Sequence, residues 1–409
     1  MSQLSKMGEL KERKYWIFPA ERRRVLDELY DLTLLCNKCL YCRFVFAPEA
    51  SDSRFVIACP RGDVFKHAAY YAEGTIEIAR SIIEKRLNWN KTIEQILYTC
   101  TDCGHCEYWC SNAMRVYPLT IMEVMKETYV KEHGLPDKWK PVIENLEKTK
   151  NQFGRPAEER YKWLPDGVSS PKYADVVLVA GDVYAYKLSN IALAAVNVLK
   201  KLGVRFTVLY ENEWHSGYLL FRAGLRDKGL EFLKHNIEAL SATGVKKVVF
   251  LDPHDYRTFK KEALEEGLTY DFEVQHFMEF VLPLLKKAEH RLEKLNIKAT
   301  YHDPCNLTRH IMPFPVWDQP REILHLIGIE VVEMPRKRLN TYCCGGGGGV
   351  PFSYPSLAKI IANKRLEEAK STGVEVLITS CPSCVWTFTG ESGMRVYDII
   401  ELIDKALIR

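Results

Sequence analysis

The sequence predicts a helical, cysteine-rich N-terminal domain followed by two α/β units of similar design. The prediction depends on the placement of the cysteines, a change of pattern near residue 172, and an internal repeat in the second half. The thirteen cysteines fall in two blocks, with none between Cys110 and Cys305. In a chain of 409 residues, this partition indicates at least two metal-bearing domains, each large enough to bury a core.

The N-terminal block of cysteines is surrounded by segments of helical periodicity. DVFKHAAYYAEGTIEIARSIIEKRL, residues 63–87, and TIMEVMKETYVKEH, residues 120–133, both repeat apolar residues at helical spacing. Strand signals are few in this part of the chain. We therefore expect residues 1–150 to form a helical domain.

From about residue 172 the pattern changes to alternating strands and helices. ADVVLVAG, RFTVLY and KKVVFLD are short, β-branched apolar runs, and KATYHD, IEVVEM and VEVLITS form a second series. Apolar strands separated by helices indicate parallel sheets that are covered on both faces. The two α/β units are expected at residues 172–291 and 292–409. The polar segment 151–171 contains Gly and Pro and is expected to connect the halves.

Two cysteine motifs in the N-terminal domain share one spacing. CNKCLYC is Cys-x2-Cys-x2-Cys, and CTDCGHCEYWC repeats this spacing before a fourth cysteine. Three thiolates at this repeat are typical of a four-iron cluster whose fourth ligand is remote, and in two-cluster ferredoxins it comes from the other motif. We therefore expect two [4Fe–4S] clusters, the first held by Cys36, Cys39, Cys42 and Cys110, the second by Cys100, Cys103, Cys106 and Cys59.

Zinc is the alternative for these motifs, because Cys-x2-Cys is also a zinc signature. Zinc takes four ligands, so the third cysteine of each motif would be surplus.

Two features depart from the usual ferredoxin pattern. Sixteen residues separate Cys42 from Cys59, and Cys110 is followed by Ser111 where ferredoxin motifs favour proline.

Composition excludes several classes of protein. The net charge of +4 comes from 57 basic and 53 acidic side chains that are interspersed, so no nucleic acid partner is indicated. The sequence shows no apolar run long enough to cross a membrane and no secretory signal. We expect a cytoplasmic protein that can dock peripherally on the membrane through a partner. A disulfide framework does not suit that compartment.

The two α/β units are related by an internal repeat. KVVFLDPHDYRTFKK matches EVLITSCPSCVWTFTG, and two further segment pairs align in the same order. The cysteines of the second unit therefore have counterparts without thiols in the first. These counterparts are Asp182, His215, Ser216, Asp252 and Asp255. The first unit is either a scaffold that keeps only the fold or a site for a different metal with nitrogen and oxygen ligands.

The second unit resembles the CCG domain of the heterodisulfide reductase family. The resemblance depends on YHDPCNLTRH, YCCGGGGG and SCPSC, with 37 residues between Cys305 and Cys343 and 36 between Cys344 and Cys381. Two helical ferredoxin-like motifs followed by tandem CCG units are similar to HdrD-like subunits and to the DsrK-like and BamD-like iron–sulfur subunits. The resemblance covers roughly residues 30–115 and 174–400.

The resemblance implies a non-cubane [4Fe–4S] cluster in the second unit. Its ligands would be Cys305, Cys343, Cys344, Cys381 and Cys384. Gly345, Gly346 and Gly347 would let the backbone approach the cluster and direct N–H dipoles at it. A phosphate-binding loop is the alternative for the glycine run, but the run lacks the Lys-Ser/Thr of a P-loop.

Several other residues have two open interpretations. His302 and Asp303 either steer protons to a departing thiolate or hydrogen-bond the turn. Arg309 and His310 are candidates for holding an acidic group of a substrate. The basic run PRKR, residues 335–338, is expected to face solvent.

The resemblance implies an electron-transferring oxidoreductase subunit that reduces or oxidises a disulfide or trisulfide substrate. The alternative is an electron relay between a flavoprotein dehydrogenase and a quinone pool or low-potential reductase. The sequence contains no flavin or nicotinamide motif, so other redox subunits are expected as partners. These would be a flavoprotein, a ferredoxin-type subunit or a membrane cytochrome.

Overall fold

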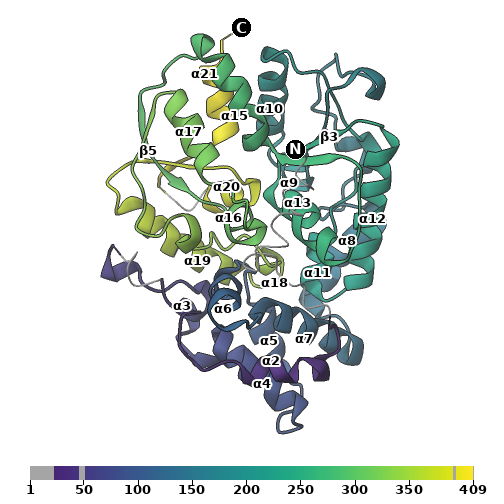
Figure 1. Ribbon diagram of the computed structural model, residues 1–409, viewed down its shortest axis with the longest axis vertical. Helices are drawn as coiled ribbons and strands as arrows, with labels where there is room; N and C mark the ends of the chain where they lie inside the picture. Colours follow the sequence, from purple (N-terminus) through teal and green to yellow (C-terminus); the bar gives the residue numbers. More distant parts are fainter. Residues whose placement is uncertain (1–22, 46–50, 390–392, 409) are drawn as a thin grey trace.

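The computed structural model describes residues 23–45, 51–389 and 393–408. A helical layer, coloured purple to blue, lies beneath two α/β units that stand side by side (Figure 1). Residues 1–22, where the sequence predicts no secretory signal, lie outside this description. Among the described helices, none is both long and apolar enough to cross a membrane.

The N-terminal region is helical, as the periodicity predicts. Pro60 and Pro118 each begin a helix, where a missing N–H costs nothing. Asn90 caps another helix by accepting hydrogen bonds from the N–H groups of Thr92 and Ile93. The helices of this region are α2 (Tyr30–Leu34), α3 (Pro60–Phe65), α4 (Ala72–Ile83), α5 (Lys91–Tyr98), α6 (His105–Met114), α7 (Pro118–His133) and α8 (Lys140–Thr149).

Two four-stranded sheets follow, and every strand pair in them is parallel. Their orders are β2-β1-β3-β4 and β6-β5-β7-β8, which are the same topology. The central strands VVLV and VLIT are buried along their whole length because helices cover both faces. The prediction of two parallel α/β units is confirmed.

The elements of the two units correspond one to one along much of the chain. The first unit contains β1 (Val176–Val179), α9 (Asp182–Tyr186), α10 (Ser189–Lys201), β2 (Phe206–Thr207), α11 (Tyr218–Ala223), α12 (Arg226–Ala242), β3 (Lys247–Phe250), α13 (Pro253–Arg257), α14 (Ala263–Glu265), β4 (Glu273–His276) and α15 (Phe277–Lys287). The second contains β5 (Ile297–His302), α16 (Cys305–Thr308), α17 (Asp318–Leu326), β6 (Ile329–Val331), α18 (Val350–Ser353), α19 (Pro355–Lys370), β7 (Val376–Thr379), α20 (Pro382–Phe388), β8 (Arg395–Asp398) and α21 (Ile399–Ala406).

The units pack against each other in a reciprocal way. Helix α10 contacts α21, and α15 contacts α17, while α10 corresponds to α17 and α15 to α21. The inner pairs α9 with α20 and α13 with α16 follow the same rule. Such exchange of equivalent partners is the signature of an approximate two-fold axis. Helices α16 and α20, which carry Cys305 and Cys384, therefore face the first unit across this axis.

The helical layer supports both units from below. Helix α11 of the first unit packs on α7, and α19 of the second packs on α3. Helix α6, which carries Cys106 and Cys110 of the second cysteine motif, contacts the turn at residues 309–311. In Figure 1, α6 accordingly lies beneath α16 of the second unit.

Candidate metal centres

The second cysteine motif lines a cavity at the start of α6. Asp102 and Gly104 have left-handed backbone, with φ of 52° and 76°. Left-handed residues between right-handed ones turn successive N–H groups toward one side, and such a concave array suits an anion. The N–H of Asp102 donates to Sγ of Cys100 at 3.4 Å. The thiols that line the cavity are Cys59, Cys100, Cys103 and Cys106, together with Cys42 of the first motif.

Cys59 reaches this cavity from outside the motif. It is the residue before α3, where Pro60 begins the helix. The carbonyl oxygen of Arg43 accepts the N–H of Ala58, and an isolated bridge between Phe44 and Ile57 holds the segment. The four thiols that the sequence predicts for one cluster thus line one cavity, and their pairing as ligands stays a prediction.

The first cysteine motif has the same backbone form as the second. Lys38 and Leu40 are left-handed, with φ of 56° and 69°, at the positions equivalent to Asp102 and Gly104. Cys110, on α6, lies near this motif. Burial raises the pKa of the Cys110 thiol, and the neighbouring Cys39 raises it further. Cys110 is thus placed to complete the set of Cys36, Cys39 and Cys42.

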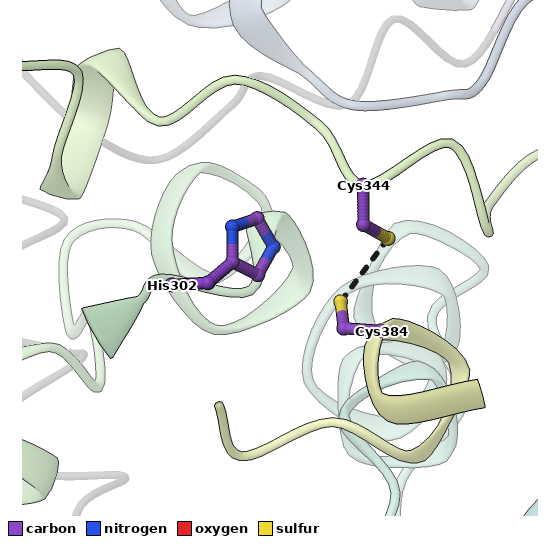
Figure 2. A group of neighbouring side chains, drawn as sticks. All are labelled: His302, Cys344 and Cys384. Atoms are coloured by element: carbon purple, nitrogen blue, oxygen red, sulfur yellow. Dashed lines mark hydrogen bonds between the residues drawn. The ribbon is translucent and has the colours of Figure 1, made fainter. Parts of the chain in front are cut away.

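The five cysteines of the second unit converge from three places in the chain. Cys305 begins α16, Cys343 and Cys344 lie in the loop before the glycines, and Cys381 caps α20, which carries Cys384. The Cys384 thiol contacts Sγ of Cys344 at 3.1 Å (Figure 2). Cys305 is partly exposed, whereas the other four are buried.

The glycine run does two things at once. Gly345 and Gly346 donate their N–H groups toward Sγ of Cys343 and Cys344, at 3.4 and 3.3 Å. Gly347 instead faces the second cysteine motif, because a Cβ there would lie 2.6 Å from the carbonyl oxygen of Thr101. Gly348 likewise abuts the backbone at Cys100. The run therefore joins the two cysteine centres by backbone contact, and a side chain would separate them.

Comparison with known proteins agrees with this arrangement. The cysteine-rich domain family named CCG matches residues 299–389. The HdrD-type subunit of the dihydromethanophenazine:CoB–CoM heterodisulfide reductase of Methanosarcina mazei is 34% identical, over 82% of this chain and 82% of that protein. The corresponding protein of Methanosarcina acetivorans is 33% identical, over 91% of this chain and 93% of that protein.

The chain belongs to the HdrD-like heterodisulfide reductase family. It is therefore an iron–sulfur oxidoreductase subunit of the HdrD type. A more distant relative, the EtfAB:quinone oxidoreductase of Syntrophomonas wolfei subsp. wolfei, is 27% identical over 80% of this chain and 48% of that protein. The donors present fit iron–sulfur clusters, since soft thiolates and inward N–H groups surround each centre.

His302 lies beside two thiols of this HdrD-like CCG centre. A ring nitrogen of His302 and the sulfurs of Cys344 and Cys384 all lie within 4.8 Å of one another. Arg365 donates from Nε to Nδ1 of His302 at 3.1 Å, so Nδ1 is the acceptor and the ring proton belongs on Nε2. The nitrogen directed toward the sulfurs is Nε2 (Figure 2). Burial, Arg365 and Arg309 hold the pKa of His302 well below its usual value.

Asp303 takes part in the structure of the turn rather than facing the thiols. Its carboxylate accepts hydrogen bonds from both terminal nitrogens of Arg321, at 2.7 and 2.9 Å, and from the N–H of Arg338 at 2.8 Å. The acceptor sites of the carboxylate are thus largely used. Of the two roles considered for Asp303, the geometry favours the hydrogen-bonded turn.

The thiol-free unit keeps the backbone of an HdrD-like CCG centre but fills its interior with ion pairs. Gly217 has a φ of 92°, matching the 91° of Gly345. Asp182, at the position of Cys305, binds Arg160 at 2.6 Å, and Arg160 also binds Glu213 at 2.9 Å. Arg160 comes from the segment expected to be a connector, and its guanidinium is almost fully buried.

The candidate metal ligands of this unit do not assemble as a group. His215 accepts the N–H of Gly217 at Nδ1, at 3.0 Å. The described residues contain two groupings of three potential ligands within 4.8 Å, and neither includes His215. One is the His302 group, and the other joins Asp252 and His254 to Cys381 across the approximate two-fold axis. His254 is not identifiable from the sequence, because no local pattern marks a contact between units.

His254 and Asp252 form a buried pair beside Cys381. Nδ1 of His254 lies 2.9 Å from the Asp252 carboxylate, whose Oδ1 also accepts the N–H of His254 at 2.8 Å. Burial opposes the charged imidazole, but Asp252 outweighs it and raises the pKa of His254 to about 9. The pair thus places a positive imidazolium near an expected cluster ligand.

Two expectations about basic residues need correction. Arg309 and His310 do not face a substrate, since Nε of Arg309 donates to the Cys103 carbonyl at 2.7 Å and Nε2 of His310 lies 2.8 Å from the Asp102 carbonyl. Both side chains are buried against the second motif. Arg336, in the run PRKR, is buried as well, because Glu368 pairs with its guanidinium at 2.9 Å.

Replacing Cys59 with Ser should damage the cluster at the second motif while sparing the first. A hydroxyl is a poor substitute for a soft thiolate around iron, and Cys59 lines the cavity of Cys100, Cys103 and Cys106. Mössbauer and EPR spectra of the anaerobically purified variant would identify the affected cluster. Cys110→Ser is the matched reciprocal variant and should damage the first-motif cluster. Loss of the first-motif cluster in Cys59→Ser would show that the pairing is wrong.

Proposed function

We propose that this protein carries electrons between a redox partner and a sulfur substrate. Two cubane [4Fe–4S] clusters would occupy the helical layer, and one non-cubane [4Fe–4S] cluster the second α/β unit. At the latter, a disulfide-type substrate would be reduced or oxidised. When bound, the non-cubane cluster supplies one-electron steps and an iron that a substrate sulfur can contact.

The convergence of five thiols at the approximate two-fold axis carries this proposal. Four of them are buried, and the partly exposed Cys305 marks the side from which a substrate would approach. Structural zinc would need four ligands and no such opening. The catalytic centre would thus comprise Cys305, Cys343, Cys344, Cys381 and Cys384, with Gly345 and Gly346 donating N–H groups to the sulfurs.

His302 would hold a proton at Nε2 beside Cys344 and Cys384. Because Arg365 occupies Nδ1, the ring cannot gain a second proton there without losing that hydrogen bond. The geometry therefore supports donation of an N–H hydrogen bond to sulfur, which stabilises negative charge on the thiolate. Transfer of the Nε2 proton would need a route that restores it from solvent.

The partner would meet the first cysteine motif. Cys39 is exposed and Cys36 partly so, whereas the cysteines of the second motif are buried or partly buried. Electrons would then pass between the first motif, the second motif and the CCG centre, whose glycine run touches the second motif. A flavoprotein, a ferredoxin-type subunit or a membrane cytochrome would suit this role, the last holding the protein peripherally at the membrane.

The proposal predicts about twelve irons and about twelve acid-labile sulfides per chain, because three four-iron clusters are expected. Iron and sulfide analysis of the anaerobically purified protein would measure both. An iron content near eight per chain would contradict the proposed non-cubane cluster. Stoichiometric zinc in place of iron at the N-terminal motifs would restore the alternative considered for them.

A relay without its own substrate is the second candidate, and the similarity to an EtfAB:quinone oxidoreductase favours it. The CCG centre would then only conduct electrons. Reduction of disulfides by the chemically reduced protein separates the two functions. Turnover supports the substrate site, and electron transfer to a quinone without disulfide reduction supports the relay.

A further inference from the structure

We infer that the thiol-free α/β unit holds the loop of the second cysteine motif and sets the reduction potential of the cluster bound there. This inference rests on the proposed function, since it requires a cluster at Cys59, Cys100, Cys103 and Cys106. Three residues of the thiol-free unit act as positioning residues through Asp102. They are Tyr218, Arg222 and Arg257.

Asp102 is the point at which this unit reaches the cluster loop. It lies between Cys100 and Cys103, and one carboxylate oxygen receives three donors from the thiol-free unit. Nη1 of Arg222 lies 2.8 Å from Oδ2, and Nη1 of Arg257 lies 2.5 Å from it. The Tyr218 hydroxyl donates to the same oxygen at 3.3 Å. Asp102 can adopt its left-handed backbone because Asp tolerates that conformation better than most residues.

The two arginines are fixed in turn by acidic partners. Glu262 binds Arg222 at 3.0 Å and Arg257 at 2.9 Å through the same oxygen. The helix between Arg257 and Glu262 widens into a π-turn over Thr258–Glu262, and π-turns are rare and often found at functional sites. Glu123 of α7 also binds Arg222 at 2.8 Å. The guanidinium groups therefore keep one position relative to the loop.

The same residues also contact the CCG centre. The Tyr218 hydroxyl accepts the N–H of Gly348 at 3.1 Å while donating to Asp102. Nη1 of Arg257 lies 3.2 Å from Oδ1 of Asn306, the residue after Cys305. One tyrosine and one arginine thus link the loops of two neighbouring cysteine centres. From the other side, Arg309 and His310 bind the carbonyls of Cys103 and Asp102.

Charge this close to a cluster changes its potential when water is excluded. The side chains of Arg222, Arg257 and Asp102 are between 0% and 5% exposed, so solvent screens them weakly. Reduction adds negative charge to the cluster, and a guanidinium stabilises the reduced state. Loss of one positive charge should therefore lower the reduction potential. Loss of a neutral hydroxyl should have a smaller effect in the same direction.

The decisive experiment compares Arg257→Gln with Arg257→Lys in the full-length, cluster-loaded protein. EPR-monitored redox titration would give the midpoint potential of the second-motif cluster. At a fixed applied potential, we expect Arg257→Gln to lower the ratio of reduced to oxidised cluster by roughly tenfold. For a one-electron couple, this corresponds to a midpoint potential about 59 mV lower. Arg257→Lys should stay near wild type because it keeps the charge. Equal shifts in both variants, or none, would overturn the inference.

Arg160→Gln is the matched control within the same unit. Arg160 is as buried as Arg257 and also binds two carboxylates, but it contacts Asp182 and Glu213 instead of the cluster loop. The Arg160→Gln variant should leave the midpoint potential of the second-motif cluster unchanged, even if the protein loses stability. An equal shift in Arg160→Gln would show a general effect of destabilisation and would overturn the inference.

Tyr218→Phe tests the inference without changing charge, should the arginine variants fail to load clusters. It removes the shared hydroxyl and should lower the potential by less than Arg257→Gln does. A potential unchanged from wild type would contradict the role of Tyr218. If wild-type protein carried no four-iron cluster at the second motif, the proposed function would fail instead, which iron analysis and the wild-type EPR spectrum would reveal first.

Discussion

Cys344→Ser is expected to abolish both disulfide reduction and the spectroscopic signal of the non-cubane cluster. Cys344 is buried, lies 3.1 Å from Cys384 and is grouped with His302, so its loss removes a central ligand. Serine offers a hard oxygen in place of a soft thiolate. Both cubane signals should persist, because their thiols lie in the helical layer. Anaerobic activity assays and Mössbauer spectra of the variant would measure each effect.

His215→Ala and Asp252→Ala are controls in the thiol-free unit, at the positions that correspond to Cys343 and Cys381. Iron content should remain near that of wild type in both, since carboxylate and imidazole do not replace five thiolates. His215 accepts a backbone N–H, and Asp252 binds His254. Loss of a bound metal in His215→Ala would assign a separate site to this unit. Disulfide reduction by Cys344→Ser at the wild-type rate would place the active centre elsewhere.

Sequence periodicity predicted the fold class because the signals are local. The helical spacing around the N-terminal motifs and the β-branched runs after residue 172 both show which side chains of a segment are buried, and this pattern is visible within each segment. The internal repeat also predicted that the second half contains two similar units, and the two sheets have the same topology. It could not predict the reciprocal packing of α10 with α21 and α15 with α17, since nothing in a segment of sequence encodes the axis that relates two units.

Cysteine spacing predicts the ligand sets but not their surroundings. The spacing predicts that Cys59 joins Cys100, Cys103 and Cys106, and these four thiols line one cavity together with Cys42. The residues that control charge around them come from distant parts of the chain. Arg257 meets Asp102 across 155 positions, and no local pattern distinguishes it from a surface arginine.

Two polar segments contain arginines whose burial the sequence does not predict. The run PRKR is expected to face solvent, and the segment 151–171 is expected to connect the halves. Arg336 and Arg160 instead lie in the interior, each paired with carboxylates that are themselves buried. Burying an unpaired charge is costly, so a basic segment is expected to face solvent. The composition of the segment cannot show which distant carboxylate will pair with a buried arginine. Only the folded arrangement reveals the compensation.

Glu368→Ala should destabilise the second α/β unit by about 3–5 kcal/mol, because it leaves two buried guanidiniums without their shared carboxylate. Glu368 is fully buried on α19 and binds both Arg336 and Arg365. Arg365 also donates to His302, so its displacement should disturb the CCG centre as well. Denaturant titration followed by circular dichroism would measure the apparent loss of stability.

Glu367→Ala is the matched control for this prediction, because it removes an exposed carboxylate from the adjacent position of the same helix. Surface changes of this kind stay within about 0.5 kcal/mol of wild type. The loss of stability in Glu368→Gln should lie between those of the two alanine variants, since an amide accepts a hydrogen bond but carries no charge. If Glu368→Ala and Glu367→Ala unfolded at the same denaturant concentration, the ion pairs of Arg336 and Arg365 would not stabilise this unit. Their burial would then reflect packing, such as that of the Arg336 guanidinium over the Tyr342 ring.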